Sequence, residues 1–119
     1  MRRLAQAHSR ALLLSCLNPA QRAEFDRTLG FTVRGQSGRQ YRIAFGATAN
    51  IEVLGPGAAL AYRLCAAPED LPTPEVMLAQ KLMLETREAE FLQIAVRHPS
   101  HAALLAAELG MAIPRRQWC

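Results

Sequence analysis

The sequence predicts an α+β fold in which a small antiparallel four-stranded meander is covered on one face by helices. Between Gly30 and Pro68, apolar residues alternate with polar ones and glycines stand at the positions of turns, which is typical of half-buried strands. From Pro74 onward the apolar residues recur with the period of a helix instead. We therefore expect an N-terminal helical hairpin, then the sheet, then a long C-terminal helix.

Two helices are predicted before the sheet. The first, over about residues 3–16, carries leucines and alanines along one side. Asn18 and Pro19 then end it and start the second, because asparagine caps helices and proline suits the first helical position. This second helix spans residues 20–29 and is closed by Gly30.

Four strands are predicted from the alternation and the glycine turns. They span residues 31–34, 39–45, 51–54 and 59–65. One face of such a sheet is apolar, and it needs a cover that the helices provide. The residues expected on that face are Phe31, Val33, Tyr41, Ile43, Phe45, Ile51, Val53, Leu60, Tyr62 and Leu64.

A proline-rich connector over residues 68–74 leads into a helix that we expect over residues 74–97. The apolar surface of this helix is unusually wide. Either the helix is packed on two sides, or part of it forms a contact between subunits. A last helix is predicted over residues 100–109.

The length of 119 residues predicts a single domain, which we place at residues 1–110. Residues 111–119, which contain Trp118 and Cys119, read as a C-terminal tail. The N-terminal residues imitate an export signal, but the apolar run is short and interrupted, and an amphipathic helix accounts for it better. We expect a cytoplasmic protein without membrane contact, since no segment approaches the ~20 apolar residues of a membrane span.

Arginines are concentrated in the first half of the chain. Residues 1–63 hold nine arginines against three acidic residues, whereas residues 64–119 hold five basic residues against seven acidic ones. Such an asymmetry can mark a surface for nucleic acid or for an acidic protein, although more often it is only a solvated face. The net charge of +4 is modest for a dedicated nucleic-acid-binding protein.

The outward face of the predicted sheet is where these arginines would gather. It is expected to present Arg34, Arg42 and Arg63 beside polar neighbours. Together with Arg39 at the start of the second strand, these arginines are the candidate contacts for a macromolecule. The aromatic residues share the opposite face, which weakens the case for base stacking on the arginine side.

Nothing in the sequence specifies a reaction. The three cysteines form no CxxC pair, which favours a reducing compartment over a disulfide framework. His98 and His101, with Cys119, are the one cluster of potential metal ligands, and it lacks a fourth ligand for zinc. We therefore expect no catalytic residue, no metal and no cofactor, and an enzyme is the class that the sequence favours least.

Several short segments together resemble a group of short uncharacterised proteins from bacteria and their phages. The matching segments are Asn18-Pro19-Ala20-Gln21-Arg22, Phe31-Thr32-Val33-Arg34-Gly35, Gly38-Arg39-Gln40-Tyr41-Arg42-Ile43, Asn50-Ile51, Leu64-Cys65 and Met77-Leu78-Ala79-Gln80-Lys81-Leu82. The resemblance covers about residues 4–96 and implies no activity. It supports Arg39, Tyr41, Arg42, Asn50, Gln80 and Lys81 as candidate shared features.

Two functional hypotheses follow. The first is a non-enzymatic binding module that holds nucleic acid or an acidic protein through the basic sheet face. The alternative is a structural or regulatory subunit of a bacterial or phage complex that oligomerises through the helix over residues 74–97. A deep polar pocket lined by Tyr41, Asn50, Gln80 and Lys81 would instead revive the enzyme class.

Overall fold

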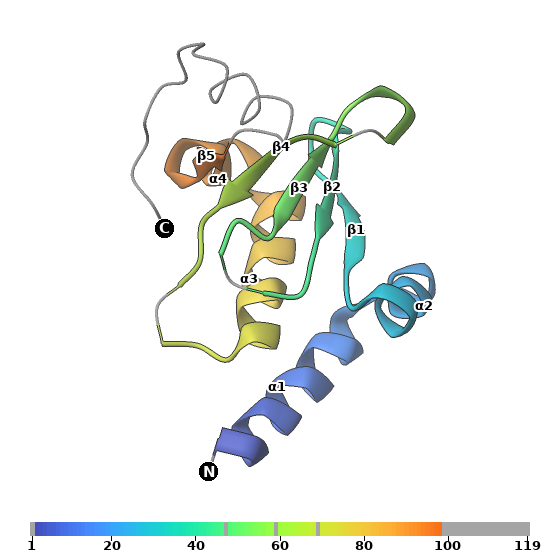
Figure 1. Cartoon of the computed structure of the whole chain (residues 1–119), viewed down its shortest axis with the longest axis vertical. Coiled ribbons are helices and arrows are strands. Elements are labelled where there is room, and N and C mark those ends of the chain that lie inside the picture. Colours follow the sequence, from blue (N-terminus) through green and yellow to red (C-terminus); the bar gives the residue numbers. More distant parts are fainter. Residues whose placement is uncertain (1, 47, 59, 69, 99–119) are drawn as a thin grey trace, which may run out of the picture.

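The computed structural model describes residues 2–46, 48–58, 60–68 and 70–98. Within them the chain forms four α-helices, one short 3-10 helix and five strands (Figure 1). In chain order the elements are α1 (Arg2–Cys16), α2 (Pro19–Thr28), β1 (Phe31–Arg34), β2 (Gln40–Ile43), β3 (Ile51–Leu54), η1 (Pro56–Ala58), β4 (Leu60–Cys65), α3 (Thr73–Thr86), α4 (Glu88–Ile94) and β5 (Val96–His98). The α+β class predicted from the sequence is confirmed.

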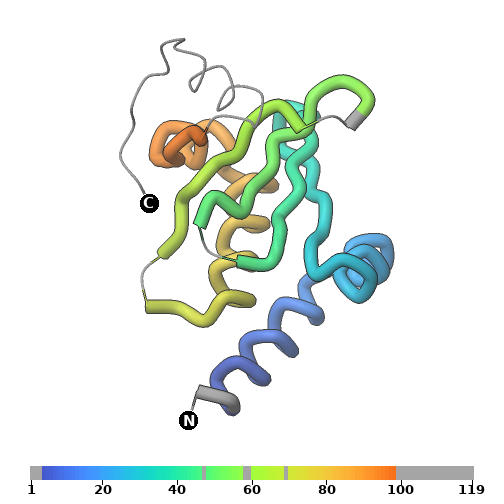
Figure 2. Tube along the Cα trace, viewed as in Figure 1, coloured from blue at the N-terminus to red at the C-terminus, as the bar shows by residue number. Residues whose placement is uncertain are grey.

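The sheet is an antiparallel meander in which every strand pairs with the next along the chain. Figure 2 shows β1 to β4 as adjacent segments that run back and forth. The expected count of four strands is wrong, because Val96–His98 add a fifth strand on the free edge of β4. Short loops join the first four strands, whereas β5 returns only after α3 and α4.

The inward face of the sheet forms the core with α3. Residues from all of β1 to β4 contribute, and most of the predicted apolar face is buried. The buried members are Phe31, Val33, Tyr41, Ile43, Ile51, Val53 and Leu64.

Phe45 and Leu60 are the two clear exceptions on that face. Phe45 lies beyond the end of β2 and is 48% exposed. Leu60 pairs with Leu54 while Tyr62 pairs with Val53, so Ala61 is an extra residue that forms a bulge. The bulge shifts the alternation by one position, which explains why Leu60 is 37% exposed.

Both N-terminal helices are present, and the second starts as predicted. The side chain of Asn18 accepts a hydrogen bond from the Gln21 backbone, and the side chain of Gln21 accepts one from the Asn18 backbone, which makes a complete capping box. The main partner of α1 is α3, and that of α2 is β1. Figure 1 shows α1 and α2 running in different directions, so the pair spreads over two different parts of the fold.

The single helix expected over residues 74–97 is wrong. α3 ends at Thr86, Arg87 adopts a non-helical conformation, and α4 starts at Glu88. The chain turns here because the backbone and side chain of Glu88 bind the β1–β2 hairpin, as described below. The wide apolar surface of α3 is explained by packing on two sides, since the sheet covers one side and α1 another.

Residues 99–119 lie outside the described part of the chain. The predicted last helix and the tail with Trp118 and Cys119 fall there, as does His101. Among the residues that are described, no helix is long and apolar enough to cross a bilayer.

Candidate functional site

The outward face of the sheet carries a cross-strand row of alternating charge. Arg42 pairs across the strands with Glu52, and Glu52 pairs with Arg63. The Nε of Arg42 lies 3.6 Å from Glu24 Oε2, and its Nη1 lies 3.5 Å from Glu52 Oε1. Arg63 Nη2 lies 3.8 Å from the other oxygen of Glu52. Two of the predicted contact arginines are therefore already balanced by two carboxylates.

Arg34 and Arg39 have different surroundings. Arg34 is exposed at the end of β1, and within the described residues it has no carboxylate at ion-pair distance. Arg39 precedes β2 and contacts the aromatic side of the sheet, where its Nη1 donates a hydrogen bond of 3.2 Å to Tyr62 Oη. The four predicted arginines thus do not form one surface.

Arg97 joins Arg39 at Tyr62. It lies on β5 opposite Leu64, and its guanidinium carbon stands 4.1 Å from the centroid of the Tyr62 ring. This distance is typical of a cation–π contact. One arginine therefore contacts the hydroxyl of Tyr62 and the other covers its ring.

A concave surface of about 380 Å³ opens beside these three side chains, and we call it the arginine hollow. Its lining residues are Arg39, Val53, Leu54, Gly55, Pro56, Ala61, Tyr62 and Arg97. Within the described chain neither Arg39 nor Arg97 has a carboxylate at ion-pair distance. Two guanidinium groups thus meet an apolar wall in one concave place.

Glu88 is a carboxylate that interacts electrostatically with Arg39. It is almost fully buried, with 4% of its surface exposed. It accepts hydrogen bonds from Ser37 N at 2.6 Å, Ser37 Oγ at 2.8 Å and Tyr41 Oη at 2.5 Å. Its own backbone N–H donates to Gln36 Oε1. These contacts fasten α4 to the β1–β2 hairpin, and a Cβ on Gly35 would stand 2.5 Å from the carboxylate.

The charge state of this cluster follows from its contacts. Burial alone would raise the pKa of Glu88, but hydrogen bonds from Tyr41 and Ser37, with the nearby charge of Arg39, outweigh it and lower the pKa. Burial, together with the bond to Glu88, raises the pKa of Tyr41 far above its ordinary value. Glu88 is therefore an anion and Tyr41 a neutral donor near pH 7.

The four residues proposed for a polar pocket separate into three places. Asn50 and Gln80 form a buried amide pair, with Nδ2 to Oε1 at 2.8 Å and Nε2 to Oδ1 at 3.0 Å. Tyr41 donates to Glu88, and Lys81 Nζ lies 2.6 Å from Glu85. The second N–H of each amide binds a backbone carbonyl, of Ala44 and of Ala66. The pair therefore links α3 to two loops of the sheet.

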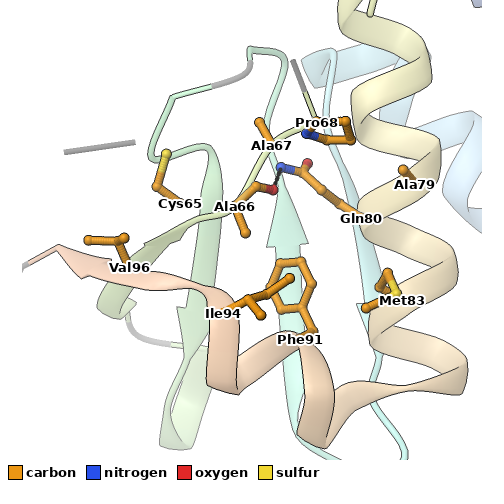
Figure 3. A pocket seen from close by; sticks show the side chains of 10 residues that line it. All are labelled: Cys65, Ala66, Ala67, Pro68, Ala79, Gln80, Met83, Phe91, Ile94 and Val96. Atoms are coloured by element: carbon orange, nitrogen blue, oxygen red, sulfur yellow. Dashed lines mark hydrogen bonds between the residues drawn. The ribbon is translucent and has the colours of Figure 1, made fainter. Parts of the chain in front are cut away.

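A larger cavity of about 450 Å³ lies between the β4–β5 edge, α3 and α4 (Figure 3). Its lining is mainly apolar, and Figure 3 shows the Gln80 amide directed at the carbonyl of Ala66. The sulfur of Cys65, also in the lining, accepts a hydrogen bond from Ala49 N at 3.0 Å. Among its described lining residues this cavity places no acid beside a base.

Tyr62, Arg97 and Glu88 were not among the site residues expected from the sequence. Tyr62 was expected to be a core residue, and Arg97 to end a helix. The signal that could have located Arg97 is the β-branched Val96 after Ile94-Ala95, but three residues are too few to separate a strand from a helix end. Within the described residues no cluster of His, Cys, Asp or Glu could hold a metal ion.

Comparison with known proteins leaves the chain without an assigned family. No family model, no curated protein and no solved structure matches it. The resemblance to short bacterial and phage proteins therefore stays a prediction, and functional arguments depend on the geometry above.

Proposed function

We propose that this chain is a non-enzymatic binding module for an anionic macromolecule, nucleic acid or acidic protein, and that the arginine hollow is its main contact. One observation carries the proposal. Arg39 and Arg97 converge on Tyr62 at a concave surface, and no described carboxylate lies at ion-pair distance from either guanidinium. Their charge is thus available to a partner.

The chemistry of arginine favours this use. A guanidinium presents a planar set of donors that matches phosphate and carboxylate oxygens, and it is less strongly hydrated than an ammonium group. Tyr62 orients both side chains before a partner arrives, which reduces the conformational entropy lost on binding. Arg42 and Arg63 contribute less, since a partner would have to compete with Glu24 and Glu52.

The oligomerising subunit is the second candidate, and exposed leucine and isoleucine side chains favour it. Ile94 is 67% exposed at the rim of the apolar cavity, and Leu82 and Leu92 are also exposed. Most of the apolar surface of α3 is already used inside one chain. A contact between subunits would therefore use α4 and the exposed side of α3 rather than one continuous helix face.

Heparin affinity chromatography with charge-matched variants tests the main proposal. The variant Arg39→Ala/Arg97→Ala should elute at clearly lower salt than the wild type. The control Arg34→Ala/Arg63→Ala removes the same charge from the outward face and should shift elution less. An equal or larger shift for the control would show that net charge or the outward face governs binding, and would refute the role of the hollow. Urea midpoints verify that all proteins are folded.

The second candidate is tested by light-scattering mass after size exclusion. Replacing Ile94 with Asp should reduce an oligomer to a monomer if α4 forms the contact. A wild-type chain that stays monomeric at high concentration would exclude it.

A further inference from the structure

We infer that the anionic partner is a single-stranded nucleic acid, and that the arginine hollow holds one nucleotide, with its phosphate at the guanidinium groups and its base against the apolar wall. The inference depends on the proposed function and narrows it to one class of partner. It is argued from three properties of the hollow: its donors, its wall and its net charge.

The donors suit a phosphate. A guanidinium carries five N–H groups, and the Tyr62 hydroxyl accepts a hydrogen bond from Nη1 of Arg39. The guanidinium carbon of Arg97 lies 4.1 Å from the centroid of the Tyr62 ring, and no described carboxylate lies at ion-pair distance from its N–H groups. Both arginines can therefore donate to oxygens of one bound group while Tyr62 holds them in place.

The wall suits a base. Leu54, Pro56 and Ala61 place apolar surface beside the two arginines. Nucleobases bind single-strand sites by laying their flat faces on aromatic rings and arginine planes, with little dependence on sequence. A volume of about 380 Å³ is at the small end of ligand sites, which suits one base rather than a stacked pair.

The net charge separates a phosphodiester from an acidic peptide. Glu88 is an anion that acts on Arg39 from beyond ion-pair distance, so it offsets part of the charge of the two arginines without occupying their N–H donors. One phosphodiester carries one negative charge. A cluster of carboxylates would be held less well by this balance, and it would leave the apolar wall uncovered.

Fluorescence anisotropy with a labelled oligothymidine tests the inference on the full chain. Arg39→Ala should weaken binding about tenfold, and the slope of log affinity against log salt should become shallower by about 0.7, as expected for one lost phosphate contact on a single strand. Tyr62→Leu removes the ring that Arg97 covers and the hydroxyl that Arg39 binds, so it should also weaken binding about tenfold by releasing both arginines. Tyr62→Phe should lose less, and the exposed control Arg34→Ala should stay within about twofold.

Three further probes separate this inference from simple attraction to polyanions. An abasic oligonucleotide and a duplex of the same length should bind at least about tenfold more weakly than oligothymidine, and polyglutamate should compete poorly. Equal binding of duplex or abasic strands would overturn the base contact. If heparin retention depends on Arg39 and Arg97 but oligothymidine binding does not, the inference fails and the proposed function survives. If neither depends on them, both fail.

Discussion

Replacing Glu88 with Ala tests the contact that joins α4 to the β1–β2 hairpin. The buried carboxylate accepts three hydrogen bonds, and the hydroxyl of the fully buried Tyr41 would lose its partner. Hydrogen bonds to a charged group contribute about 1.5 to 3 kcal/mol each, and an orphaned buried donor costs about 1 to 3 kcal/mol. Ser37 is exposed and can bind water instead, so Tyr41 dominates the loss.

We expect a loss of about 3 kcal/mol in the free energy of unfolding, measured by urea titration with an unchanged m-value. For a chain of 119 residues this corresponds to a fall of about 10 °C in the melting temperature. Glu90→Ala is the matched control, because Glu90 lies on the same helix, is exposed and pairs only with Arg87 among the described contacts. It should change stability by no more than about 0.5 kcal/mol.

A double-mutant cycle with Tyr41→Phe isolates the central bond. The two substitutions should be non-additive, with a coupling energy of about 2 kcal/mol between the hydroxyl and the carboxylate. A cost for Glu88→Ala no larger than that for Glu90→Ala, or a coupling energy near zero, would refute the reasoning.

Three other predictions concern the same framework. The pKa of Glu88 is lowered below its ordinary 4.5, so its stabilising effect is complete above that pH and is lost as pH falls through the folded-state value. Glu88→Gln should therefore reduce the fall in urea-measured stability at acidic pH, and an unchanged fall would contradict this. Gly35→Ala should cost about 2 to 3 kcal/mol in urea unfolding because the added Cβ would meet the Glu88 carboxylate. Gly38→Ala, at φ +88° with nothing within 4 Å of the added Cβ, should cost about 1 kcal/mol, and equal costs for the two variants would count against the clash. Gln80→Ala should destabilise by about 2 to 4 kcal/mol because it leaves the Asn50 amide without its partner; a loss below 1 kcal/mol in thermal unfolding would show that water replaces the contact.

Local chemistry made most of the fold predictable. Glycine turns and period-two alternation located β1 and β3 to the residue, and Asn18 and Pro19 located the start of α2. Each of these elements is determined by neighbours in sequence. The antiparallel meander followed from the short loops between them.

The errors arose where distant contacts decide the local structure. Nothing near Arg87 in sequence signals a helix end. The break coincides with hydrogen bonds that Glu88 donates to Gln36 and accepts from Ser37, about fifty residues away. Val96–His98 are too few to be distinguished from a helix end by their sequence, and they form a strand by pairing with the edge of β4. The bulge at Ala61 also depends on a contact between strands, because it is defined only by the pairing of β4 with β3.

The candidate site was predicted in part for the same reason. Counting charges drew attention to the arginines, but a count cannot show that Arg42 has Glu24 and Glu52 as ion-pair partners while Arg39 and Arg97 have no described carboxylate at ion-pair distance. Tyr62 was assigned to the core because its strand position is inward, and its hydroxyl and ring serve the arginines at the open end of that face. The amide pair of Asn50 and Gln80 was noticed as two unusual residues and proved to be one structural contact.

The measurement that tests the central claim most directly is an NMR titration of the ¹⁵N-labelled chain with oligothymidine, observed at the backbone amides and the arginine Nε–H groups. The account predicts that the largest shifts occur at Arg39 and Arg97 and along residues 53–55 and 61–62, which line the arginine hollow. Shifts centred on Arg34 and Arg63 instead, with the hollow unaffected, would contradict it and return the binding function to the outward face of the sheet.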